Sequence, residues 1–222
     1  MPDDFVFALK GSRYITHVRA LEGIDEAMPN FFASGMLSLG RKLGPILWQL
    51  PPWHRFDAGR LESFLAALPR SMAEAAAIGR RHDSRVDGKV WLDVDEDRPL
   101  RHALEVRNAS FETDAFTELM TRYGVAIVVA DSAGRFPQIT EVTSDFMYVR
   151  LHGHEELYVS GYPDDLLAEW ADRIDGWRTG ATAGGRRLDV YAYCDNDAKV
   201  RAPYDAMRLR ELLEDREGAR VA

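Results

Sequence analysis

The sequence contains a single cysteine, no long apolar run and no excess of basic residues, and each shortage excludes a class of protein. One thiol, that of Cys194, allows no intramolecular disulfide bond, which favours a reducing compartment. The apolar runs fall far short of the roughly 20 residues that a membrane-spanning helix needs. The first residues lack the basic start and apolar stretch of a signal peptide. We therefore expect a cytoplasmic protein with no membrane partner.

The charge balance bears on the partner. The formal net charge is -8 over 222 residues, whereas nucleic-acid-binding proteins usually carry a basic excess. A nucleic-acid partner is therefore not expected, although a local basic pocket remains compatible with this charge. A hydrophobic content of 46% fits one domain with a sizeable core, so we interpret residues 1–222 as a single domain. Within it, we interpret residues 83–100 as a surface insertion and residues 215–222 as a C-terminal tail.

Short apolar runs alternate with amphipathic segments along the chain. The runs are typical of buried parallel strands, and they cover residues 5–9, 45–50, 103–106, 125–130, 146–151 and 188–194. Helical spacing of apolar residues predicts helices over residues 30–43, 57–68, 116–123 and 166–177, with a last helix opening near Pro203. The shortest crossover, residues 131–145, has room for a helical turn at most. This order predicts an α/β fold with a parallel sheet covered by helices.

Polar residues close every one of the six predicted strands. They are Lys10, Gln49, Glu105, Arg107, Asp131, Arg150, His152, Asp195, Asn196 and Asp197. The carboxyl ends of parallel strands lie at one edge of a sheet, where binding sites of this fold class are built. Alternation along a strand places Glu105 and Arg107 on one face, and Arg150 and His152 on one face of another strand.

These residue types suggest a pocket of mixed charge. Lys10, Arg107 and Arg150 are candidates to hold a phosphate or carboxylate, with Gln49, Asn196 and Asp197 as further ligand-binding candidates. Glu105, Asp131 and Asp195 are candidate general acids or bases, and His152 is a candidate proton shuttle. An ion-pair network that only satisfies a buried rim is the alternative interpretation. Aromatic side chains after the strands, Tyr14 and His17 among them, either wall such a pocket or simply pack the loops.

No cofactor is identified, and no metal site is predicted. His152 and His154 have a spacing compatible with two metal ligands on one strand face, but no specific ligand set accompanies them. Asp93, Asp95 and Asp97 resemble the start of a calcium loop, but the glycine and glutamate that such a loop requires are missing.

Five segments, in order, resemble the YecE-like family, which is catalogued as a domain of unknown function, number 72. They are residues 5–17, 43–52, 105–107, 148–153 and 195–197. The resemblance implies a (β/α)₈ barrel of the triosephosphate isomerase type and brings no established reaction. It departs mildly from the family at Leu9, Asn108 and Cys194.

The resemblance also implies that this chain begins about two βα units into the family pattern, so that about six of eight units, strands three to eight, are present. Such a barrel would have open edges, and self-association through them is an expected consequence. We expect the native protein to be longer.

Three functions compete at this stage. The first is an enzyme acting on an anionic small molecule at the carboxyl ends of the strands. The second is a non-catalytic module that binds nucleic acid or protein through aromatic and basic loops, with Arg13 among its supports. The third is a truncated copy with little activity.

Overall fold

The computed structural model describes residues 2–221, without the side chain of Val221, and Met1 and the last residue of the predicted tail lie outside the described residues. The chain forms two compact units, Met1–Ser110 (unit 1) and Phe111–Ala222 (unit 2). Both are α/β units in which strands and helices follow one another along the chain. The predicted α/β class is confirmed, and all six predicted strands are found.

Unit 1 contains three parallel strands: β1 (Phe7–Lys10), β2 (Leu43–Gln49) and β3 (His102–Glu105). β2 pairs with β1 on one side and with β3 on the other. All residues of β2 after Leu43 are buried, as expected for a strand covered on both faces. The register places Gln49 beside Glu105, at the carboxyl ends of the two strands.

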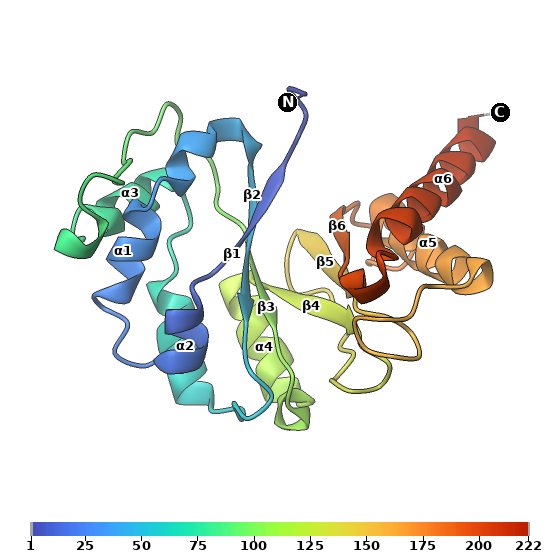
Figure 1. The fold of residues 1–222 in the computed structure, drawn as a ribbon, viewed down its shortest axis with the longest axis horizontal. Coiled ribbons are helices and arrows are strands. Elements are labelled where there is room, and N and C mark those ends of the chain that lie inside the picture. The colour runs from blue at the N-terminus through green and yellow to red at the C-terminus, as the bar shows by residue number, and fades with distance from the viewer. Residues whose placement is uncertain (1, 222) are drawn as a thin grey trace. The chain divides into compact units, whose positions relative to one another are not determined.

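The helices of unit 1 are α1 (Ala27–Ala33), α2 (Ala58–Ala67) and α3 (Met72–Gly79), all on the same side of the strands (Figure 1). Trp48 of β2 anchors them, because its fully buried ring lies 5.2 Å from that of Phe31 in α1 and 5.3 Å from that of Phe64 in α2. Short helical turns cover Tyr14–Val18, Met36–Lys42, Ser84–Val86 and Ala109–Phe111.

The helix predicted over residues 30–43 is wrong as one element. It is interrupted by Gly35, whose φ of 87° is left-handed, so α1 ends at Ala33 and a separate 3₁₀ segment follows from Met36 to Lys42. Glycine adopts this conformation without a steric penalty, and it terminates helices for that reason. The prediction also missed α3, whose alanine-rich sequence has little amphipathic contrast.

Residues 83–99 contain no buried residue and no strand, and only one turn of 3₁₀ helix. Their polar side chains have structural partners: Asp95 forms an ion pair with Arg98 at 2.8 Å, and Asp97 accepts a hydrogen bond from the backbone of Ala73 at the start of α3. The Arg98 guanidinium lowers the pKa of Asp95 to about 2.

Unit 2 contains the parallel strands β4 (Ala126–Asp131), β5 (Phe146–Leu151) and β6 (Asp189–Cys194), with β5 between the other two. The crossover from β4 to β5 contains no helix, as its length predicted. Instead, Thr143 fixes it by donating to the carbonyl of Val125 and accepting from the amide of Ile127.

The helices of unit 2 are α4 (Asp114–Tyr123), α5 (Asp164–Thr179) and α6 (Ala202–Val221). α4 ends at Gly124, whose backbone is left-handed, and α6 continues through residues 215–221. α5 and α6 lie side by side (Figure 1). The apolar face of α5 packs with Val129, Val149 and Leu151 in one core, in which Cys194 is a partly buried hydrophobe. None of the helices within residues 2–221 has the length and apolar character to cross a lipid bilayer.

Candidate functional site

The polar residues of unit 1 gather at the carboxyl ends of its strands, on the face away from the helices. Trp48 points toward α1 and α2, so the next residue, Gln49, points to the opposite face. Gly11 allows β1 to pass close to Trp48, because a Cβ atom there would lie 2.2 Å from the indole ring. Lys10 therefore ends β1 beside Gln49, and its Nζ donates to Gln49 Oε1 at 3.0 Å.

Glu105 and Arg107 form an ion pair beside them. Arg107 Nε donates to Glu105 Oε1 at 2.7 Å, the length of a strong charge-assisted bond. The carboxylate is completely buried, whereas 12% of the arginine side chain is exposed. The pair therefore presents its positive member to the surface. The structure brings together four of the predicted site residues in this way: Lys10, Gln49, Glu105 and Arg107.

A histidine that sequence reasoning had treated only as a loop aromatic belongs to this group. His17 lies in the helical turn Tyr14–Val18, with Nδ1 2.9 Å from Thr16 Oγ1. Burial lowers the pKa of His17, and the positive charges of Arg13, Lys10 and Arg107 lower it further. We call Lys10, Arg13, His17 and Arg107 the basic cluster. The family-like segment that begins at Phe5 includes His17, but the resemblance assigns it no role, so only the folded loop indicates its place beside the basic residues.

In unit 2, Arg150, His152 and Asp195 form a second group, the Asp195 cluster. Arg150 Nη2 donates to Asp195 Oδ2 at 2.7 Å, and His152 Nδ1 lies 2.9 Å from the same oxygen. A carboxylate only accepts, so His152 carries its proton on Nδ1 in this contact. The side chain of His152 is fully buried and that of Arg150 is 11% exposed, but 35% of Asp195 is exposed. Asp195 is therefore the accessible group, and it offers an acceptor to hydroxyl or amino groups of a ligand.

Asp131 does not join this cluster. It follows Val129 by two residues and so shares the helix-facing side of β4, where Trp170 Nε1 of α5 donates to its Oδ2 at 3.3 Å. Tyr162 is a second neighbour: burial raises the pKa of its hydroxyl, and the charge of Asp131 raises it further. Asp131 thus ties β4 to α5 and to the loop after β5. Sequence reasoning missed Trp170 in this role because its helical spacing indicated only core packing.

The two remaining predicted residues follow β6. The Asn196 amide is fully buried and donates to the carbonyl of Ser160 at 2.9 Å and to Asp205 Oδ2 at 2.7 Å, so it connects the loop after β5 to α6. Asp197 is exposed and begins a short 3₁₀ turn. The structure therefore brings Asn196 into a structural network and leaves Asp197 at the surface.

Two further groups, one histidine and one cysteine, are structural. His102 accepts from Trp48 Nε1 through Nδ1 at 3.2 Å, and its Nε2 lies 2.7 Å from the carbonyl of Pro69. Burial lowers the pKa of His102 to about 4, so the ring is neutral at pH 7. Burial also raises the pKa of the Cys194 thiol to about 12, which makes it unreactive. Across the described chain, residues 2–221, no three His, Cys, Asp or Glu side chains are grouped as a metal site requires.

Comparisons with known proteins identify the family and the fold of the chain. Residues 1–221 match the family described as protein of unknown function DUF72. A crystal structure of a DUF72 family protein from Thermotoga maritima MSB8 is similar with a TM-score of 0.70 and 22% identity, over 96% of this chain and 75% of that one. A DUF72 family protein from Enterococcus faecalis V583 has a TM-score of 0.68 and 16% identity, over 96% of this chain and 76% of that one. No curated protein matches the chain.

Proposed function

We propose, from the premise that the chain belongs to the DUF72 family, that it is an enzyme acting on an anionic small molecule that binds at the basic cluster of unit 1. The observation that carries the proposal is that two cations lie at the carboxyl ends of the strands on either side of β2: Lys10 donates to Gln49 at 3.0 Å, and Arg107 donates to Glu105 at 2.7 Å. Their charges, with that of Arg13, add to burial in lowering the pKa of His17. Cations that repel a proton from one histidine create a local positive potential, and an anion bound there relieves that repulsion.

The chemistry of the cluster favours a phosphate or a carboxylate. Arg107 is held by Glu105 at 2.7 Å, which supports a planar fork suited to such groups, and Lys10 supplies a more mobile charge. His17 is the candidate acid or base. A lowered pKa keeps its ring neutral at pH 7, so it accepts a proton from the ligand, and the bound anion then stabilises the imidazolium that forms.

Binding is tested with inorganic phosphate and malonate as probes, by thermal unfolding and by NMR titration of the histidine rings. Both probes should raise the Tm of the wild-type protein, because a ligand that binds only the folded state stabilises it. The double variant Lys10→Ala/Arg13→Ala should lose most of this rise. Arg41→Ala is the matched control, because Arg41 is an exposed arginine of the same unit that pairs with Asp3.

The NMR titration gives a second readout. Phosphate should raise the pKa of His17, so affinity should increase as the pH falls toward that pKa. An equal Tm shift in the double variant, or a His17 pKa that phosphate leaves unchanged, contradicts anion binding at this cluster.

The catalytic part needs its own measurement. A mixture of phosphorylated and carboxylated metabolites, incubated with the protein and followed by mass spectrometry, should lose at least one component. His17→Gln should abolish that loss, whereas His82→Gln, at a histidine elsewhere in unit 1, should retain it. If the probes bind but no component is consumed, the protein is a binding protein and the catalytic part is wrong.

A further inference from the structure

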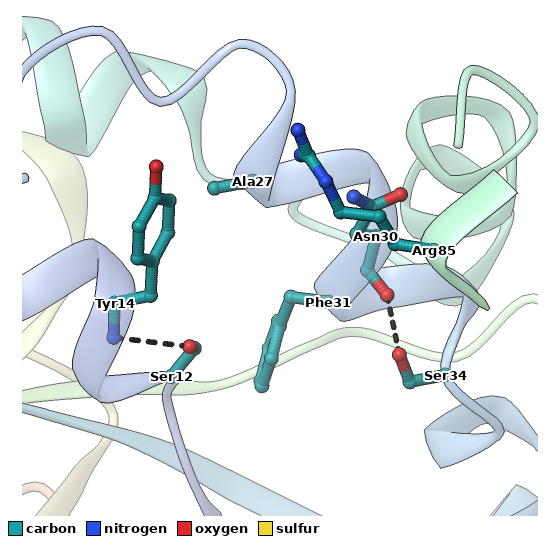
Figure 2. A pocket seen from close by; sticks show the side chains of 7 residues that line it. All are labelled: Ser12, Tyr14, Ala27, Asn30, Phe31, Ser34 and Arg85. Atoms are coloured by element: carbon teal, nitrogen blue, oxygen red, sulfur yellow. Dashed lines mark hydrogen bonds between the residues drawn. The ribbon is translucent and has the colours of Figure 1, made fainter. Parts of the chain in front are cut away.

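A separate cavity of about 500 Å³ opens in unit 1, in the size range of small-molecule pockets. It is lined by Ser12, Tyr14, Ala27, Asn30, Phe31, Ser34 and Arg85 (Figure 2). None of these residues belongs to the basic cluster, so the cavity is a distinct feature of the unit.

Two aromatic rings from different elements border the cavity. Phe31 of α1 is fixed, because its ring lies 5.2 Å from those of Phe32 and Trp48. Tyr14 stands on the helical turn Tyr14–Val18, and 49% of the residue is exposed. Figure 2 shows Tyr14 and Phe31 on different sides of the open space. One wall is therefore anchored and the other is free to adjust, an arrangement suited to a flat ring.

The polar side of the cavity is built around one guanidinium. Asn30 Nδ2 donates to Asp83 Oδ2 at 3.0 Å, and Asn30 Oδ1 accepts from the backbone amide of Asp83, also at 3.0 Å. Asp83 in turn holds Arg85 Nη1 at 3.0 Å, and Glu26 lies 3.6 Å from the same nitrogen. In residues 2–221, Nε and Nη2 of Arg85 hydrogen-bond to no protein group, so these donors are available to a ligand.

The local charge decides between ligand classes. Two carboxylates, those of Asp83 and Glu26, accompany the single positive charge of Arg85, so the surroundings do not favour an anion. An uncharged acceptor, such as a ring nitrogen or a carbonyl oxygen, suits the available Nε–H and Nη2–H donors. Arginine also packs well on flat π-systems.

We propose that this cavity binds an uncharged planar heteroaromatic ring of the nucleobase type, with its faces against Tyr14 and Phe31 and its acceptor atoms toward Arg85. The cavity and the proposed anion site share no residue, and they adjoin along the chain, because Arg13 lies between the lining residues Ser12 and Tyr14.

Adenosine is the probe, and calorimetric titration of the folded protein is the measurement. Tyr14→Ala should weaken adenosine binding by about tenfold or more, the factor that stacking of a base on an aromatic side chain typically contributes. Tyr14→Phe keeps the ring and should retain most of the affinity. Tyr204→Ala is the matched control, because this tyrosine is 66% exposed in unit 2 and lies outside the cavity.

Two results would overturn the inference. One is an adenosine affinity that Tyr14→Ala leaves unchanged while the variant keeps the wild-type Tm. The other is a preference for benzoate over adenosine at this cavity, since a planar anion should suffer repulsion from Asp83 and Glu26. The mutated tyrosine is exposed, so loss of folding is not an expected complication.

Discussion

The Glu105–Arg107 pair beside the basic cluster of unit 1 and the Asp195 cluster of unit 2 both join a carboxylate to an arginine, and they present opposite charges. In unit 1 the carboxylate, Glu105, is completely buried, and its partner Arg107 is 12% exposed beside the exposed Lys10. In unit 2 the carboxylate, Asp195, is 35% exposed, and its partners Arg150 and His152 are 11% and 0% exposed. Unit 1 thus exposes the cation of its pair and unit 2 exposes the carboxylate.

The difference teaches that an arginine paired with a carboxylate at a strand end does not by itself indicate which of them meets the ligand. The deeper member of a pair is stabilised by its partner, and the shallower one keeps contact with water. Burial, and not residue type, assigns the role. Mutations should therefore act differently in the two clusters.

The largest expected effect is on the buried carboxylate of unit 1. Arg107→Ala removes the 2.7 Å ion pair of the completely buried Glu105 carboxylate, so the free energy of unfolding should fall by about 3–5 kcal/mol. Urea unfolding measures the change, with Arg41→Ala, at an exposed arginine, expected to cost less than about 0.5 kcal/mol. A loss as small as that of the control would mean that Glu105 does not depend on Arg107.

Acid should also lower the stability of unit 1, because its buried histidine, His102, is neutral at pH 7. The buried histidine of unit 2, His152, contacts the carboxylate of Asp195 instead. The pKa of His102 is about 4 in the folded state, below the 6.5 of an unburied histidine, so the unfolded chain binds a proton first. The free energy of unfolding that the neutral His102 ring contributes is fully present above pH 6.5. It is lost as the pH falls toward 4, by about 3 kcal/mol in total. His102→Gln should flatten this part of the stability profile measured by urea unfolding between pH 7 and 4. An unchanged slope in the variant would assign the acid sensitivity to other groups.

The smallest effect is expected at the exposed carboxylate of unit 2. Asp195→Asn keeps an acceptor oxygen for Arg150 and His152 but removes the charge, so the free energy of unfolding should fall by about 1–2 kcal/mol. Asp197→Asn is the control, because that carboxylate is exposed two residues further along and should change stability by less than about 0.5 kcal/mol. If the free energy of unfolding falls equally in both variants, the hydrogen bonds of Asp195 to Arg150 and His152 do not stabilise unit 2.

Much of the framework could be predicted because it depends on local pattern. The six strands are apolar runs that end in polar residues. The helices predicted over residues 57–68 and 116–123 are found, with Asp57 capping the start of one and Gly124 the end of the other. Alternation along a strand also predicted that Glu105 and Arg107 share a face, as their ion pair requires. The helix break at Gly35 was not predicted, because the sequence around a glycine inside an apolar pattern does not indicate whether its φ is positive.

The sequence by itself determined where the strands end and which residue types stand there. Only the tertiary structure decided how those residues are used: Asp131 contacts Trp170 of a helix 39 residues away, Asn196 connects Ser160 to Asp205, and the basic residues gather around His17. The physical reason is that periodicity assigns a side chain to a face, whereas partners and burial depend on register and on the elements packed above that face. For that reason the charge each cluster presents could be read only from the folded chain.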